Sequence, residues 1–373
     1  MNRLTAIGLA SLVAWGVLIA TKYAGFAPAS AGDRAPARAA SHDSKPTIGE
    51  SAVLPVAAEP RATASIASAN RIQTVKASAA SLEFRAATDL KAYADQLSAR
   101  RASLNADERY HLAKTLEECQ FVASMNEDLI AYAAKQRRLF LASLPAGDPL
   151  NGKRIAAFEA SDNTQRCARF QGTRISAKEI EELYAAAAQQ GDPRAQARMF
   201  VADLNKHNNG SSAPKPPGDT SAGQRTDGGS ELNVLIGLLE THDPEAVVTV
   251  GQVLSSMATT QQLRIGRDGD VAEPNAFLGA FLLVACDYGP DCITLNREAL
   301  NACAYAGYCD ARSYEDLYQN FLASPFAYAQ AMRYRNIIHD AIATRNWALI
   351  GLSPKSAPFL ANAAKAQRTV ASR

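Results

Sequence analysis

The sequence lacks an excess of charge of either sign, because 39 Lys and Arg residues nearly balance 37 Asp and Glu residues. A dedicated nucleic-acid binder usually carries a concentrated basic face, so nucleic acid is not an expected partner. Strand signals are also scarce from residue 83 onward: alternating β-branched runs are few, and no Asn-Gly or Asp-Gly turn lies between two of them. The chain is nevertheless 47% hydrophobic, as in a globular protein. We therefore expect an all-α fold.

Patterns that would bind a metal are missing as well. The chain has five histidines, and none lies four residues from another, so no helical histidine pair exists. The last four cysteines are spaced C-x5-C-x10-C-x5-C, whereas zinc sites normally use C-x2–4-C knuckles. The segment from Arg267 to Asp270 resembles part of a calcium loop, but no glutamate follows at the twelfth position. We expect neither a metal nor a cofactor.

Aromatic residues are absent from 27–83, and 17 of residues 27–82 are alanine. Such a stretch cannot bury enough apolar surface to offset the entropy of ordering it. We predict a disordered tether over 27–82. We also predict a disordered tail over 353–373, since the last 20 residues hold four basic and no acidic residues.

Before this tether, residues 4–21 are uncharged and mostly apolar. At ~1.5 Å per helical residue, this length barely crosses a hydrocarbon core of ~30 Å, yet it exceeds the usual signal-peptide core of ~7–15 residues. Residues 1–26 therefore predict a signal anchor, and the alternative is a signal peptide cleaved after Ala31. The anchor would place the protein in a bacterial inner membrane with its domain in the periplasm, whereas cleavage would release it into the periplasm.

Cysteine usage agrees with export, because the chain has an even count of six and all lie beyond the tether. We expect local disulfides Cys286–Cys292 and Cys303–Cys309, with a crossed pairing of these four as the alternative. Cys119 and Cys167 then pair by elimination, which would contribute about 4 kcal/mol in the chain-entropy model.

Helix signals are dense in the rest of the chain. Asn105–Glu108 and Ser176–Glu179 look like capping boxes, and we predict four or five helices between 82 and 190 with a loop near Pro145–Pro149. Leu278–Ala285 and its flanks are an apolar run that is too short to cross a bilayer, so it predicts a fully buried helix.

One tetrad recurs four times as a capping residue, proline, any residue and alanine. The first residue can accept hydrogen bonds at a helix start, and proline at the first helical position loses none. The tetrads begin at Asp192, Asp243, Glu273 and Ser324. They predict helix-pair repeats, in an N-terminal segment 83–205 and a C-terminal cysteine-containing segment 231–352, separated by a flexible insert 206–230. The alternative is that unrelated helices share a common start signal.

The stretch Glu181–Phe200, with its Ala-rich first helix, Gly191-Asp192 turn and Ala195-Gln196 opening of a second helix, resembles the Sel1-like branch of the tetratricopeptide superfamily. The closing aromatic-x-Gly element of that family is missing, and at the second tetrad His242 stands where the turn glycine would be. The resemblance covers about 20 residues, with a weaker match at 243–258. It implies an α-solenoid whose concave face binds other proteins.

Residues 314–345 are rich in tyrosine and arginine, which often dominate interfaces. The possible interface residues are Tyr328, Arg333, Tyr334 and Arg335. The alternative, which we favour, is that they pack between the last helices. His339 is expected to be an ordinary helix histidine.

The sequence predicts an envelope protein that binds another envelope protein or a peptide and is not an enzyme. One alternative is an all-α periplasmic enzyme that acts on the cell wall through a carboxylate pair. Its candidates would be Glu117, Glu118, Glu179, Glu181 and Glu182, although solvated helix faces explain these residues equally. The other alternative is a structural stabiliser without a discrete ligand.

Overall fold

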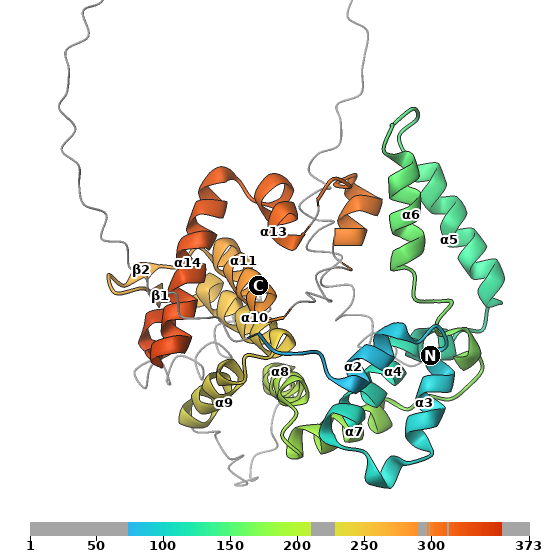
Figure 1. The fold of residues 1–373 in the computed structure, drawn as a ribbon, viewed down its shortest axis with the longest axis horizontal. Helices are drawn as coiled ribbons and strands as arrows, with labels where there is room; N and C mark the ends of the chain where they lie inside the picture. The colour runs from blue at the N-terminus through green and yellow to red at the C-terminus, as the bar shows by residue number, and fades with distance from the viewer. Residues whose placement is uncertain (1–73, 210–227, 290–296, 298, 312, 353–373) are drawn as a thin grey trace, which may run out of the picture. The chain divides into compact units, whose positions relative to one another are not determined.

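A computed structural model describes residues 74–209, 228–289, 297, 299–311 and 313–352. Within them the chain is mostly helical, which confirms the all-α prediction (Figure 1). None of the helices in these ranges is long and apolar enough to cross a bilayer. The expected anchor 1–26, the tail 353–373, and most of the tether and insert lie outside the described residues.

One hydrophobic core lies among the N-terminal helices. These are α2 (Ala79–Ala86), α3 (Leu90–Ser98), α4 (Ala106–Ala123) and α7 (Ala177–Gln189), with the 3₁₀ turns η2 (Arg101–Ser103) and η3 (Ala168–Phe170). Helix α4 packs against the other three helices. The helical region starts four residues earlier than the predicted 83, because the Ser78 side chain caps α2 and Ala80 is buried.

The two predicted capping boxes have different outcomes. At the start of α4, the Asn105 side chain accepts from the Glu108 N–H, and the Glu108 carboxylate accepts from the Asn105 N–H, as predicted. The box predicted at Ser176 is wrong, since Ser176 makes no side-chain cap. Its expected partner, Glu179, instead lies 2.7 Å from an Arg101 nitrogen, in an ion pair between distant parts of the chain.

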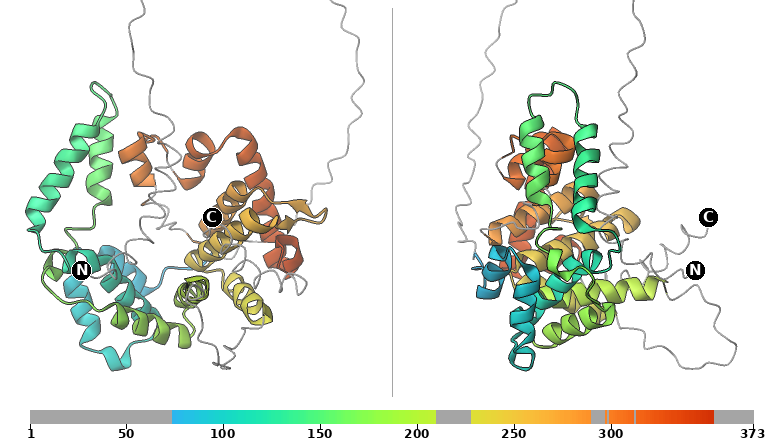
Figure 2. Two further views of the ribbon diagram at one scale, coloured as in Figure 1. Left: turned by 180° about the vertical axis from the view of Figure 1, so that it is seen from behind. Right: turned by 90° about the vertical axis from the view of Figure 1, so that its right-hand side faces the viewer.

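Helices α5 (Leu129–Ser143) and α6 (Asn151–Ser161) form a hairpin that contributes Leu129 to this core and otherwise lies apart from it (Figures 1 and 2). The predicted loop around Pro145–Pro149 joins them. The segment from residue 82 to residue 190 thus contains α2 to α7, which is more than the predicted four or five helices. The Cys119–Cys167 disulfide forms as predicted and encloses the whole hairpin.

A second core lies among the C-terminal helices. These are α8 (Pro193–Asn209), α9 (Gly228–Glu240), α10 (Pro244–Gln261), α11 (Pro274–Tyr288), α13 (Tyr314–Leu317) and α14 (Pro325–Thr344), with π-helical turns η5 (Ala302–Ala306) and η6 (Tyr318–Leu322) and the 3₁₀ turn η7 (Trp347–Ile350). Helix α11 packs between α10 and α14, and its predicted apolar run is buried from Gly279 to Ala285, while Leu278 is half-buried. Phe281 approaches so closely that a Cβ at Gly251 would lie 2.3 Å from its Cβ.

All four tetrads begin helices as predicted. Helices α8, α10, α11 and α14 each start at the tetrad proline, and the residue before it accepts a hydrogen bond from the N–H of the tetrad alanine. In the first three tetrads that alanine is fully buried, at 0% exposure. The small side chain therefore allows neighbouring helices to approach the first turn.

The pairs α7–α8 and α9–α10 are built alike. In each pair a first helix of 13 residues is followed by a three-residue turn and a second helix of 17 or 18 residues. Each turn has a residue with positive φ just before the capping aspartate: Gly191 at 91° and His242 at 56°. The histidine at the glycine position thus adopts the same left-handed region.

A short antiparallel hairpin interrupts the helices, where no hairpin was expected. Strand β1 (Arg264–Ile265) pairs with β2 (Asp270–Val271), and Asp268-Gly269 lies in the loop between them. With only two residues in each strand, no alternating pattern was visible in the sequence. The calcium-like segment is therefore the turn of this hairpin.

The disulfide Cys303–Cys309 also forms as predicted. Cys286 is disulfide-bonded as well, and its expected partner Cys292 lies outside the described residues. Disulfides persist in oxidising compartments, which agrees with export.

Candidate functional site

A dense polar cluster lies where α4 meets α7, α8 and α10. Residues three or four apart lie on one side of a helix. On α4 this spacing aligns titratable and polar side chains: Asp107, Tyr110, His111, Lys114 and Glu117. These side chains form one polar side of α4, which contacts Arg194 and Arg198 on α8 and Glu245 on α10.

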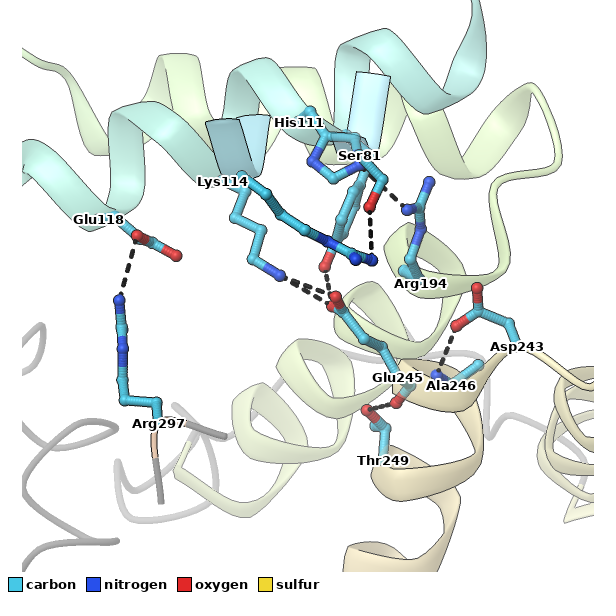
Figure 3. Close-up of polar contacts among 12 residues, drawn as sticks. Ser81, His111, Lys114, Glu118, Arg194, Asp243, Glu245, Ala246, Thr249 and Arg297 are labelled. Atoms are coloured by element: carbon cyan, nitrogen blue, oxygen red, sulfur yellow. Dashed lines mark hydrogen bonds and ion pairs between the residues drawn. The ribbon is translucent and has the colours of Figure 1, made fainter. Parts of the chain in front are cut away.

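Glu245 enters this cluster from the first turn of α10 (Figure 3). Its Oε1 lies 2.8 Å from Lys114 Nζ, and the Tyr110 hydroxyl donates a short hydrogen bond to Oε2. Burial raises the pKa of Glu245, but Lys114, the Tyr110 hydrogen bond and Arg194 outweigh it and hold the pKa at about 2. The carboxylate is thus ionised at neutral pH and anchors α10 to α4, which is not the state of a proton donor.

Arg194, at the start of α8, holds the other side of the cluster. Its guanidinium lies 2.5 Å from both Asp107 and Asp192 and stacks over the Tyr110 ring at 4.2 Å. One of its nitrogens lies 3.2 Å from His111 Nε2 (Figure 3). Burial and the neighbouring Arg194 charge lower the pKa of His111 to about 3, so this histidine is neutral.

The glutamates considered for cell-wall hydrolysis are all ion-paired. The pairs are Glu117–Arg198, Glu118–Arg297, Glu179–Arg101, Glu181–Lys206 and Glu182–Lys178. Glu117 also accepts a hydrogen bond from the Tyr184 hydroxyl at 2.8 Å. Each carboxylate therefore has a nearby cation that explains its position.

A second polar cluster ties α11 to α14. Asp287 Oδ2 lies 2.8 Å from His339 Nε2, and the Arg335 guanidinium binds the same carboxylate. The other ring nitrogen of His339 lies 3.4 Å from the Tyr288 hydroxyl. Burial raises the pKa of Asp287, but hydrogen bonds from His339 and Arg335 outweigh it and lower the pKa. Both nitrogens of His339 are thus engaged by neighbouring side chains.

The four possible interface residues on α14 do not share one surface. Tyr334 is 3% exposed, lies in the core and accepts a hydrogen bond from the Glu273 N–H. Arg335 belongs to the Asp287 cluster, and both Arg335 and Tyr328 contact Glu315. Arg333 is exposed and pairs with Asp270.

The exposed side of α14 includes a residue that the sequence analysis missed. Phe326 is 67% exposed, and Ala329, Arg333 and Asn336 follow it on the same side at intervals of three or four residues. Leu322, in the turn before α14, is 43% exposed. The available signal was the position of Phe326 beside the helix-starting proline, where no earlier turn of α14 itself can cover it.

No family model, no curated protein and no solved structure matches this chain.

Proposed function

We propose that this chain is an exported helical-repeat protein that binds another protein or a peptide of the bacterial envelope. The residues that we assign to binding form the exposed side of α14 together with the turn before it: Leu322, Phe326 and Arg333. The exposure of Phe326 together with Leu322, four residues before it, carries the proposal, because exposed apolar side chains that are grouped, unlike single ones, are typical of binding surfaces.

The likeness of the pairs α7–α8 and α9–α10 supports the repeat architecture. Their helices start 51 residues apart (177 and 228, then 193 and 244), and their turns use the same backbone conformation. Stacked helix pairs form extended surfaces that commonly bind other proteins. The Sel1-like resemblance of residues 181–200 points the same way.

The location belongs to the proposal as well. The disulfides favour an oxidising compartment, and the apolar segment 4–21 supplies either a membrane anchor or an export signal. We place the domain in the periplasm, held to the inner membrane by residues 1–26 or released after cleavage near Ala31.

In-cell photo-crosslinking tests the proposal with a matched control. A photoreactive phenylalanine analogue is placed at position 326 in the full chain, and in a second protein at position 130, since Ile130 on α5 is 76% exposed. We expect a discrete product from position 326 that is absent from position 130. No product at 326, or the same products at both positions, would overturn the assignment of this surface.

The affinity of the captured partner for two variants completes the test. Phe326→Ala should weaken binding by about tenfold or more if the residue is an interface anchor. The same variant should unfold like the wild type, because the removed side chain is mostly in solvent. Ile130→Ala should change neither property.

A further inference from the structure

The α5–α6 hairpin rests on the loop that the Cys303–Cys309 disulfide closes. Arg154 on α6 is 7% exposed and donates to the backbone carbonyls of Ala304 at 2.9 Å and Tyr305 at 3.2 Å. Beside it, Lys153 Nζ lies 2.7 Å from Asp310. The hairpin thus depends on the position of two carbonyl groups that lie between the two cysteines.

A small aromatic cluster reinforces this contact and is separate from both main cores. The rings of Phe140 on α5 and Phe158 on α6 stack at 4.2 Å. The Tyr305 ring meets both edge-on, at 5.6 and 6.2 Å. Phe140 is 5% exposed, so separation of the hairpin from the loop would bring an aromatic surface into solvent.

The two disulfides near the hairpin differ in accessibility. Cys119 and Cys167 are 0% and 1% exposed, and their bond joins α4 to the segment just before η3, on either side of the hairpin in the sequence. Cys309, by contrast, is partly exposed, and it closes a loop with only six residues of sequence separation. A thiolate from solvent therefore reaches the second bond without opening a core.

We propose that Cys303–Cys309 is a thiol–disulfide exchange site, and that its reduction releases the α5–α6 hairpin from the 302–310 loop. The co-substrate is a dithiol, such as a periplasmic thiol reductase or dithiothreitol. One reductant thiolate attacks a sulfur, the protein S–S bond breaks, and a mixed disulfide forms. The second reductant thiol resolves it, so that the protein gains two electrons and two protons as two thiols while the reductant becomes a disulfide.

Release follows because the bond holds η5 in the shape that presents the carbonyls of Ala304 and Tyr305. Without the bond, the loop gains conformational freedom and the two carbonyls leave Arg154. The guanidinium would then retain Asp148, 3.3 Å away, as its only hydrogen-bond partner among those that the structure describes. A buried guanidinium with so few partners favours the undocked hairpin.

The test combines differential alkylation with amide hydrogen exchange on the full chain, treated with dithiothreitol without denaturant. We expect Cys303 and Cys309 to be alkylated more than about tenfold faster than Cys119 and Cys167. After this selective reduction, amides in 129–161 should exchange more than about tenfold faster, while those in α10 and α11 are unchanged.

Two variants distinguish release of the hairpin by the 302–310 loop from destabilisation of the whole fold. The double variant Cys303→Ser/Cys309→Ser should show rapid exchange in 129–161 without reductant. Arg154→Met should show it with the disulfide intact. The proposal is overturned if hairpin exchange stays at the wild-type rate after reduction and in the double variant, if α10 and α11 loosen equally, or if Cys119–Cys167 is reduced as fast.

Discussion

Lys114 Nζ lies 2.8 Å from the Glu245 carboxylate, although 131 residues separate the two in the chain. This pair joins α4, which belongs to the N-terminal core, to α10, which belongs to the C-terminal core. The two hydrophobic clusters are distinct, so charged and hydroxyl groups account for much of the contact at this point. The contact makes the relation between the two cores sensitive to single polar substitutions.

Glu245→Gln should destabilise the fold at neutral pH, because Lys114 loses its carboxylate partner. The Glu245 side chain is 30% exposed, so water screens the ion pair in part, and we expect the substitution to lower the free energy of unfolding by about 1–2 kcal/mol. The folded-state pKa of about 2 lies below the ordinary value of 4.5, so this stabilisation is present above pH 4.5 and disappears as pH falls toward 2. Urea unfolding at pH 7 and pH 3 should therefore show a smaller difference between variant and wild type at pH 3.

The matched control is Glu182→Gln. Glu182 is 61% exposed and lies 3.7 Å from Lys178 on the same helix, so its loss should change stability by less than about 0.5 kcal/mol. Equal effects of the two substitutions would show that the contact between α4 and α10 carries no special stability.

Asp243→Asn should stabilise the protein at pH 7.5. Burial raises the pKa of Asp243 to about 6. The contribution of this carboxyl to wild-type stability is therefore fully present below pH 3.8 and is lost as pH rises through 6. Asparagine retains the helix cap without this charge, and the gain should be about 1–2 kcal/mol at pH 7.5 and much smaller at pH 5. Thermal unfolding across this pH range measures it.

Asp192→Asn should have the opposite effect on stability, although Asp192 caps α8 as Asp243 caps α10. Asp192 is 4% exposed, and its carboxylate lies 2.5 Å from Arg194, so removal of its charge should destabilise the protein at pH 7.5. Loss of stability at pH 7.5 in both asparagine variants would show that burial of the Asp243 charge does not destabilise the protein.

Gly251→Ala should destabilise the second core, while Gly237→Ala should not. A Cβ at Gly251 would overlap Phe281, and we expect a loss of about 1–3 kcal/mol. At Gly237, also inside a helix, nothing lies within 4 Å of the added Cβ, so alanine should gain about 0.5–1 kcal/mol from helix propensity. Denaturant unfolding of both variants checks the sign of each effect.

The turns of the two similar helix pairs should respond differently to substitution. Gly191→Ala forces a side chain into positive φ and should cost about 1–2 kcal/mol. His242→Gly removes that strain but also the edge-on contact of the His242 ring with Tyr288 at 4.9 Å, so the net change should stay within about 1 kcal/mol. Equal destabilisation by both changes would contradict the shared turn conformation.

Local signals in the sequence predicted the starts of α4, α8, α10, α11 and α14, and a long-range contact explains the error at α7. At Asp192, Asp243, Glu273 and Ser324 the cap and the proline act within one turn, so their effect does not depend on the rest of the fold. The predicted box at Ser176 is absent because the Glu179 carboxylate has a distant competitor in Arg101.

The members of the polar clusters could not be predicted without the fold. The spacing of Asp107, Tyr110 and Lys114 marks one polar side of α4, but nothing in the sequence identifies Glu245 as its partner. Similarly, Tyr334 and Arg335 are adjacent in sequence, yet one faces the core and the other faces Asp287. Helical periodicity was sufficient to place the two residues on different sides of α14, whereas composition alone assigned both to one possible interface.

The Cys119–Cys167 bond gives the α5–α6 hairpin the character of an insertion module. The Cα atoms of the two cysteines are 5.2 Å apart, so the chain segments that precede and follow the hairpin meet at this bond. Apart from Leu129 at the start of α5, no residue of α5 or α6 belongs to the N-terminal core that this bond closes. Related chains can therefore lengthen, shorten or exchange this hairpin while the helices beneath it keep their packing, which leaves it free to diverge faster than its support.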